Sequence, residues 1–183
     1  MNSNPELHVR QARTVDIVNI QYLIKISSRS IGTKYYARDL VEAALNTVLG
    51  VDTQLIRDGT YFVAEQGNTM LGCGGWSRRR TLFGSDSVRG RDDDLLNPAT
   101  DAAKIRAFFV HPDYVRHGVG SRILDLCEHV ARSAGFLKLE LGATLSGTAF
   151  YLRHGFVAGT PYDYECAPGM NMEIVPMSKG LER

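Results

Sequence analysis

The residues best suited to chemistry in this sequence form a glycine loop, V-R-H-G-V-G-S, at positions 115–121. An apolar stretch with strand periodicity precedes the loop, and an apolar stretch with helical periodicity follows it. Gly118 and Gly120 allow another group to approach the backbone closely, and the first turn of a helix presents unpaired N–H groups at the positive end of its dipole. The pattern therefore predicts a site that binds phosphate through backbone amides.

Two common phosphate motifs differ from this loop. A P-loop has a Lys-Ser or Lys-Thr pair after its second glycine, whereas Gly120 is followed by Ser121 and Arg122. A dinucleotide-binding loop has a third glycine three residues after the second, and Ile123 occupies that place. For the loop taken alone, a pair of glycines that begins a helix without binding any ligand is the alternative interpretation.

A strand before the loop and a helix after it must position these amides. Ile105, Ala107 and Phe109 alternate with their neighbours, which predicts a strand over residues 102–110 with these three side chains on one face. Pro112 ends the strand because proline has no N–H to donate. Residues 137–141 alternate again after the helix, so the second strand should lie parallel to the first.

The remaining elements follow from the same periodicities. We expect a short strand at 8–12, helices over 14–28 and 37–48, a hairpin of strands 60–65 and 70–76, and closing strands 156–158 and 171–178 joined by a loop at 161–169. Residues 77–101 show no periodicity, so we expect a long loop that either has a function or is disordered.

Two stretches together resemble the GCN5-related N-acetyltransferase (GNAT) superfamily. The strand, the His-Pro-Asp turn, the run V-R-H-G-V-G and the helix resemble its acetyl-CoA-binding motif, although Val115 stands where Gln or Arg is usual. The run F-Y-L-R-H-G-F at 150–156 resembles its second signature, although Thr144 stands at the usual Asn position. The resemblance covers about residues 60–178.

The resemblance implies a mixed α/β GNAT fold with a highly twisted central sheet of about seven strands. Helices cover both faces, and the parallel pair of strands splays apart to admit the pantetheine arm of the coenzyme. The implied reaction moves an acetyl group from acetyl-CoA to an amine of a small molecule or peptide. The alternative is a module of the same fold that binds or senses acyl-CoA without turnover, and the length of the acyl chain stays open.

The resemblance also implies roles for individual residues. The coenzyme contacts would come from Phe108, Phe109, Val110, Val115, Arg116, His117, Gly118, Val119, Gly120 and Ser121. Tyr151 would be the general acid that protonates the departing thiolate, and a main-chain N–H near Val110 would polarise the thioester carbonyl. The general base stays open between Glu65, Glu140 and a chain of water molecules.

The acceptor site is implied less directly. In this fold the first two helices wall the acceptor site, so Tyr35 and Tyr36 are candidate contacts, as are residues 162–165. Residues 77–101 would then shape the acceptor site, because they immediately precede the coenzyme-binding strand. Ordinary packing or solvent exposure is the alternative for each of these residues.

Length and composition limit the classes of protein to which this chain can belong. The 183 residues suit one acetyltransferase domain over 1–183, and a net charge of +1 predicts no general attraction to nucleic acid or to an anionic membrane. Three cysteines without C-x-x-C spacing favour reduced thiols over a disulfide framework or a metal site. No apolar run reaches membrane-spanning length, and the first residues lack the apolar segment of a signal peptide. We therefore expect a cytoplasmic protein without a metal, and the sequence is compatible with a homodimer but does not determine the oligomeric state.

Overall fold

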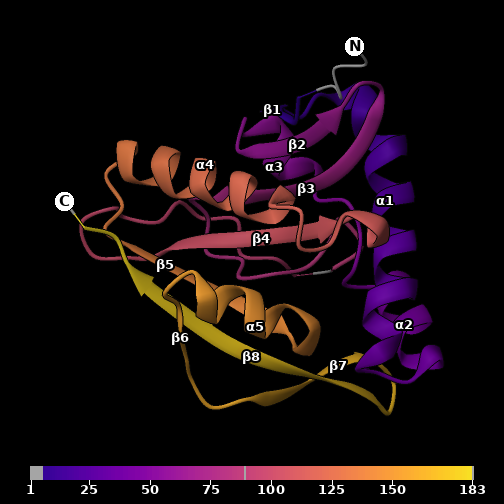
Figure 1. Ribbon diagram of the computed structural model, residues 1–183. Helices are drawn as coiled ribbons and strands as arrows, with labels where there is room; N and C mark the ends of the chain where they lie inside the picture. Colours follow the sequence, from indigo (N-terminus) through magenta and orange to yellow (C-terminus); the bar gives the residue numbers. More distant parts are fainter. Residues whose placement is uncertain (1–5, 89, 183) are drawn as a thin grey trace.

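The computed structural model describes residues 6–88 and 90–182, arranged around one twisted sheet (Figure 1). The strands are β1 (His8–Gln11), β2 (Tyr61–Gln66), β3 (Thr69–Ser77), β4 (Ala103–Val110), β5 (Lys138–Thr144), β6 (Val157–Ala158), β7 (Tyr162–Ala167) and β8 (Met170–Gly180). The α-helices are α1 (Ile17–Ile31), α2 (Arg38–Leu45), α3 (Thr53–Arg57), α4 (Val119–Ser133) and α5 (Leu145–Arg153), and short 3-10 helices are η1 (Thr14–Asp16), η2 (Gly32–Lys34) and η3 (Pro112–Tyr114).

The strands of the described residues form an eight-stranded sheet in the order β1-β2-β3-β4-β5-β8-β6, with β7 paired to β8. Neighbouring strands run antiparallel except β4 and β5, which are parallel because α4 connects them. One face packs against α4 and α5, and the other packs against α1, α2 and α3. The mixed α/β fold with helices on both faces is therefore confirmed.

The parallel pair splays apart, as expected. Ladder pairing between β4 and β5 covers only Ala103 with Leu139 and Lys104 with Glu140. Beyond these pairs β4 stays with β3 as far as Val110, whereas β5 pairs with β8 along its whole length. The C-terminal half of β4 therefore has a strand on one side only.

A bulge in β4 interrupts the alternation of side chains that the sequence predicted for this strand. The register against β3 shifts near Ala107, whose φ of +54° lies in the left-handed region. The hydroxyl of Tyr61 donates a hydrogen bond to the carbonyl of Ala107 at 2.9 Å and holds the bulge. Ile105 therefore faces α4, whereas Ala107 and Phe109 face α1, so the prediction that these three side chains share one face was wrong.

The prediction of a loop at 161–169 was also wrong over most of its length, since residues 162–167 form β7. Tyr162 pairs with Ile174, and the register continues along β8. Tyr164 and Cys166 pack in a core cluster, while Asp163 and Glu165, which alternate with them, are exposed, and this alternation is typical of a strand. This additional strand brings the sheet to eight, against an expectation of about seven.

The helices differ from expectation at two C-terminal ends and in one additional helix. The helix predicted over 37–48 is α2, which ends at Leu45, three residues before the predicted end. The first helical segment begins with η1 and continues as α1 to Ile31, three residues beyond the predicted end at 28. The helix α3 was not predicted because its five residues are too few to show a helical period. Asp52 begins α3 by accepting a hydrogen bond from the N–H of Gln54. In the described part of the chain, no helix is long and apolar enough to cross a membrane.

The long segment between β3 and β4 is irregular, but buried ion pairs hold it against the body. Arg79 pairs with Asp58 at 2.6 Å. Arg91 pairs with Asp52 at 3.1 Å, and Arg106 of β4 contacts the other oxygen of the same carboxylate at 2.6 Å. The side chain of Asp52 is 0% exposed, so the middle of the segment is anchored at a buried charge.

Candidate active site

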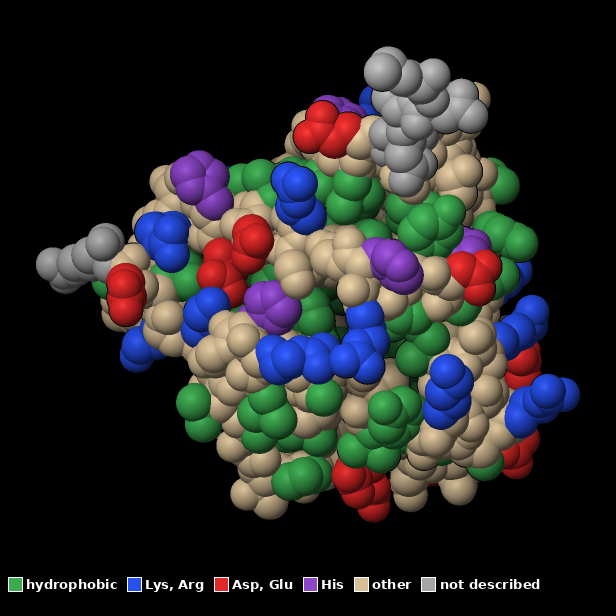
Figure 2. Space-filling model, in the orientation of Figure 1, with side chains coloured by type: hydrophobic (Ala, Val, Ile, Leu, Met, Phe, Trp, Pro, Cys, Tyr) green, Lys and Arg blue, Asp and Glu red, His purple; other side chains and the backbone are tan. Residues whose placement is uncertain are grey.

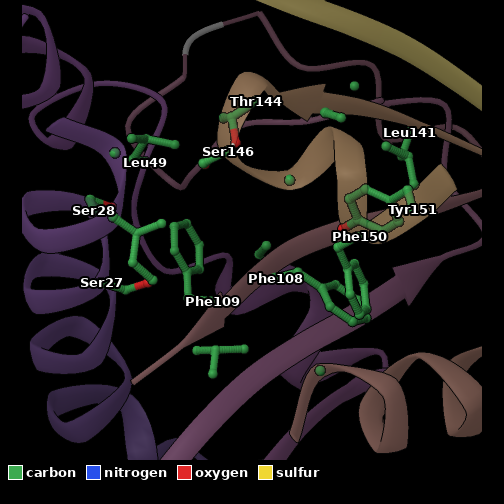
Figure 3. A pocket seen from close by; sticks show the side chains of 18 of the residues that line it. Ser27, Ser28, Leu49, Phe108, Phe109, Leu141, Thr144, Ser146, Phe150 and Tyr151 are labelled. Atoms are coloured by element: carbon green, nitrogen blue, oxygen red, sulfur yellow. Dashed lines mark hydrogen bonds between the residues drawn. The ribbon is translucent and has the colours of Figure 1, made fainter. Parts of the chain in front are cut away.

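A cavity of about 770 Å³ opens where β4 and β5 diverge. In Figure 3, Ser27 and Ser28 of α1 stand with Leu49 on one side of it, and Phe150 and Tyr151 of α5 stand on the other. Residues from α2, β7, β8 and the start of α4 complete the wall. The cavity therefore joins the predicted phosphate loop to the C-terminal part of the sheet.

The glycine loop reaches the cavity at the N-terminus of α4. Gly118 is the N-cap with a φ of +80°, and Arg116 also has a positive φ of +68°. The first helical hydrogen bond runs from the N–H of Arg122 to the carbonyl of Gly118, at 3.0 Å, which leaves the preceding N–H groups of the first turn without helical partners. These groups and the helix dipole can bind an anion.

The two glycines of the loop are needed for different reasons. A Cβ on Gly118 would meet no atom within 4 Å, so this position requires glycine for its backbone angle. A Cβ on Gly120 would lie 3.2 Å from the ring of Phe150, so this position requires glycine for space. The close approach at Gly120 therefore also joins α4 to α5.

Positive charge gathers around the loop. Arg116 and Arg153 line the cavity beside the start of α4. Figure 2 shows Lys and Arg side chains across the middle of this face, between α4 and α5. Such a surface suits a ligand with several phosphates.

The sequence analysis did not assign His154 to the site. Its Nδ1 lies 2.8 Å from the carbonyl oxygen of Phe150, and its Nε2 lies 3.0 Å from Oγ of Ser121. A carbonyl can only accept, so Nδ1 carries a hydrogen, and neutral His154 accepts the hydroxyl hydrogen of Ser121 at Nε2. The sequence holds little signal for this contact, because the two residues lie on separate helices.

The predicted coenzyme residues 108–110 lie along the open side of β4. Val110 and Phe109 pair with β3 on one side, and the other side faces the cavity. The N–H of His111 donates to Leu71 of β3 at 2.8 Å. Successive N–H groups of a strand point in opposite directions, so the N–H of Val110 points away from β3 and toward the gap.

Tyr151 lies in the wall of the cavity between this strand and α5. It is 7% exposed, and its ring packs edge-on against Phe108, Phe150 and Phe156. Burial raises the pKa of Tyr151 well above its usual value, so the phenol keeps its proton at neutral pH. Among the described residues, none forms a hydrogen bond with its hydroxyl.

Neither glutamate considered as the general base lies in the cavity. Glu65 pairs with Arg10 at 2.7 Å near the first strand. Glu140 pairs with Lys104 where β4 and β5 are still joined. Of the residues that the structure describes, no aspartate or glutamate lines the cavity.

Some candidate acceptor contacts only line the cavity, whereas Tyr36 also holds neighbouring elements together. Tyr35 lines the cavity and is 53% exposed, and Tyr164 is the one residue of 162–165 that lines it among those described. The hydroxyl of Tyr36 donates to the carbonyl of Glu173 at 2.8 Å and accepts from the N–H of Leu145 at 2.7 Å. Tyr36 therefore joins the turn before α2 to β8 and α5, besides lining the cavity.

Metal-binding side chains do not gather at the site. Within residues 6–88 and 90–182, no group of three His, Cys, Asp or Glu side chains is arranged to hold an ion. The cysteines Cys73, Cys127 and Cys166 are buried as free thiols. The residues that line the cavity offer backbone amides, hydroxyls and cationic side chains.

Comparison with known proteins identifies a family. The sequence profile of the acetyltransferase (GNAT) family matches residues 29–156. Among curated proteins, no match to the chain is found.

Solved structures share the fold. A GCN5-related N-acetyltransferase from Rhodopseudomonas palustris is 21% identical, with a TM-score of 0.69 over 98% of this chain and 97% of its own. PaiA N-acetyltransferase from Thermoplasma acidophilum, solved in complex with coenzyme A, is 13% identical, with a TM-score of 0.64 over 96% of this chain and 99% of its own. A GNAT family acetyltransferase from Brucella melitensis, solved with acetyl-CoA, is 16% identical, with a TM-score of 0.57 over 97% and 90%.

Proposed function

Because the chain belongs to the acetyltransferase (GNAT) family, we propose that it transfers an acetyl group from acetyl-CoA to the amine of a small molecule or peptide. The observation that carries this proposal is the continuous cavity that joins the glycine loop of α4 to the buried phenol of Tyr151. Structures of the same fold solved with coenzyme A and acetyl-CoA support acetyl-CoA as the cosubstrate.

The coenzyme would bind from the loop inward. Its pyrophosphate accepts hydrogen bonds from the free N–H groups of Val119, Gly120 and Ser121 at the start of α4, and Arg116 and Arg153 add positive charge. The pantetheine arm then lies along the open side of β4, where the backbone of residues 108–110 has no second strand to pair with. This placement brings the thioester toward Tyr151.

The thioester carbonyl needs a hydrogen-bond donor, and this hydrogen bond must become stronger as negative charge develops on the carbonyl oxygen. The N–H of Val110 points into the gap between β4 and β5, which suits this role. A fixed backbone donor costs little reorganisation in the transition state, so it stabilises the tetrahedral intermediate more than the substrate.

Tyr151 would complete the transfer. The amine lone pair attacks the carbonyl carbon and forms the new C–N bond, and collapse of the tetrahedral intermediate breaks the C–S bond. Tyr151 donates its proton to the departing sulfur and is reprotonated from solvent, while the attacking nitrogen loses one proton to water. Its raised pKa keeps the acid form available throughout the neutral range.

Replacement of Tyr151 by Phe tests this role, because it deletes the hydroxyl and keeps the apolar ring. We expect kcat to fall by about 10²-fold, at the low end of the usual range for general acid catalysis, since thiolates leave fairly well without help. Coenzyme affinity and melting temperature should change little. Tyr22→Phe, at a side chain 65% exposed on α1, is the matched control.

Two results would contradict the proposal. An unchanged kcat in Tyr151→Phe, measured where chemistry limits turnover, would move the acid role to water. Coenzyme binding without acetyl transfer to any amine in a broad panel would favour the binding or sensing module instead.

A further inference from the structure

One part of the cavity is mostly apolar and aromatic. We call it the acceptor chamber and define it by Ser28 and Ile31 of α1, Leu49, Phe83, Phe109 of β4 and Tyr164 of β7. The rings of Phe83 and Tyr164 pack edge-on, with centroids 4.8 Å apart. Figure 3 shows Phe109 between α1 and the residues of α5. Such walls suit a flat apolar body.

The chamber offers no negative charge to a cation. All twenty Asp and Glu residues of the sequence lie within the described part of the chain, and none of them lines the cavity. Its charged lining residues, Arg106, Arg116 and Arg153, are all cationic. A protonated amine that entered the chamber would therefore lose its hydration without gaining a counter-ion.

Arg106 does not make the chamber a carboxylate site. Its side chain is 1% exposed, and its guanidinium is already paired with the buried carboxylate of Asp52 at 2.6 Å. It also donates to the carbonyl of Gly84 at 3.0 Å. Both contacts involve Nη2, and Nε and Nη1 have no partner among the described residues, but Asp52 already compensates the charge of the guanidinium.

Two lining residues, Ser28 and Arg106, carry polar atoms without a partner among the described residues, and Ser28 is the uncharged one. Ser28 is 6% exposed, and its Oγ forms no hydrogen bond with any described residue. Buried hydroxyls are usually satisfied, so an unpaired one that lines a cavity points to a ligand that supplies the partner. A hydroxyl oxygen can accept a hydrogen bond from the N–H of a neutral amine.

From these observations we propose that the acceptor is an aromatic amine whose nitrogen is uncharged at neutral pH, held by the aromatic walls and by Ser28. This inference rests on the proposed acetyl transfer and names its substrate class. An arylamine nitrogen carries its lone pair unprotonated at neutral pH, so attack on the thioester needs no prior deprotonation. The missing carboxylate base is then consistent with the substrate. The nitrogen bonds to the acetyl carbon, the C–S bond breaks, Tyr151 protonates the sulfur, and water takes the proton that the nitrogen releases.

Three amines of similar size test the proposal with the full chain and acetyl-CoA. Aniline has an aromatic body and a neutral nitrogen, benzylamine has an aromatic body and a charged nitrogen, and cyclohexylamine is aliphatic and charged. We expect kcat/KM at pH 7 to be at least tenfold higher for aniline than for benzylamine, and higher still relative to cyclohexylamine. Between pH 6 and 8 the value for aniline should stay nearly constant, whereas that for benzylamine should rise with the free-base fraction.

Variants of α1 separate the role of Ser28 from general stability. Ser28→Ala should raise KM for aniline about tenfold and leave the coenzyme Kd unchanged, and Ser30→Ala, at an exposed position of the same helix, should change neither. Ser28→Asp supplies the missing counter-charge and should shift the preference toward benzylamine.

The possible outcomes are distinct. If benzylamine or cyclohexylamine equals or exceeds aniline at pH 7, the inference is wrong while the proposed acetyl transfer stands. If Ser28→Ala and Ser30→Ala behave alike toward aniline, Ser28 does not hold the acceptor. If no amine is acetylated and no free thiol appears although coenzyme A binds, the proposed function fails and this inference fails with it.

Discussion

Replacement of Asp52 by Asn should destabilise the protein strongly, because this carboxylate neutralises two buried arginines. One oxygen of Asp52 lies 3.1 Å from Arg91, and the other lies 2.6 Å from Arg106. The side chain of Asp52 is 0% exposed, and those of the two arginines are 10% and 1% exposed. Asn keeps the volume, but it removes the charge and places an amide donor against guanidinium donors.

The size of the loss follows from this geometry. Nε and Nη1 of Arg106 already lack partners among the described residues, so Asp52 is its main source of compensation. Removing one partner of a buried pair typically costs about 3–5 kcal/mol, because the other charge is left uncompensated. For a chain of this size, each kcal/mol lowers Tm by about 2–4 °C, so a fall of about 6–20 °C is expected.

Urea unfolding measures the loss. Trp76 is the one tryptophan of the sequence and is 2% exposed, so its fluorescence reports on the core beside the anchored segment. The midpoint should fall while the m-value stays constant if the folded state keeps its compactness. Glu42→Gln, in the exposed pair with Arg29, is the matched control and should have little effect. If Asp52→Asn cost no more than this control, the buried cluster would not anchor the segment between β3 and β4.

Two further predictions concern the coenzyme and pH. Gly120→Val should weaken coenzyme A binding by at least tenfold, about 1.4 kcal/mol by calorimetry, because a Cβ there lies 3.2 Å from Phe150 beside the proposed phosphate site. Gly180→Val is the control, because a Cβ at Gly180 meets nothing within 4 Å. Equal affinities in the two variants would contradict this placement of the phosphates. Stability should fall as acid is added below about pH 4, because hydrogen bonds from Arg10 and Arg79 hold the pKa values of Asp16 and Asp58 below their usual range. The carboxylates stabilise the fold above the unfolded-state pKa, and this contribution is lost as pH falls through the folded-state pKa. Melting temperatures from pH 6 to pH 2 should decline less steeply in Asp58→Asn than in the natural sequence, and identical slopes would count against the pair.

The parts of the site that the sequence predicted are local in the chain. The strand, the glycine loop and α4 lie next to one another, and the change from period two to helical period marks their boundaries. The position of Tyr151 on a short helix after β5 also follows from a local run. Turn chemistry and periodicity act over a few residues, so they can be recognised without the rest of the fold.

The contacts that reshape the site join distant segments. The bulge at Ala107 depends on a hydrogen bond from Tyr61 in β2, and it decides that Phe109 faces α1. The contact between His154 and Ser121 joins α5 to α4. The residues around Ala107 show the same periodicity as an ordinary strand, and those around Ser121 and His154 show that of ordinary helices. The periodicity of the sequence therefore could not reveal the bulge or the contact between the two helices.

The sequence by itself determined the mixed α/β fold, the glycine loop at the start of α4 and the short helix that carries Tyr151. The tertiary structure alone decided that Glu65 and Glu140 lie outside the cavity, that Asp52 anchors the segment between β3 and β4, and that the chamber around Ser28 has no carboxylate. The physical reason is that burial and charge compensation depend on which surfaces meet when the sheet and helices pack. Periodicity places a side chain on a face of its own element, but the partner of that face comes from elsewhere in the chain.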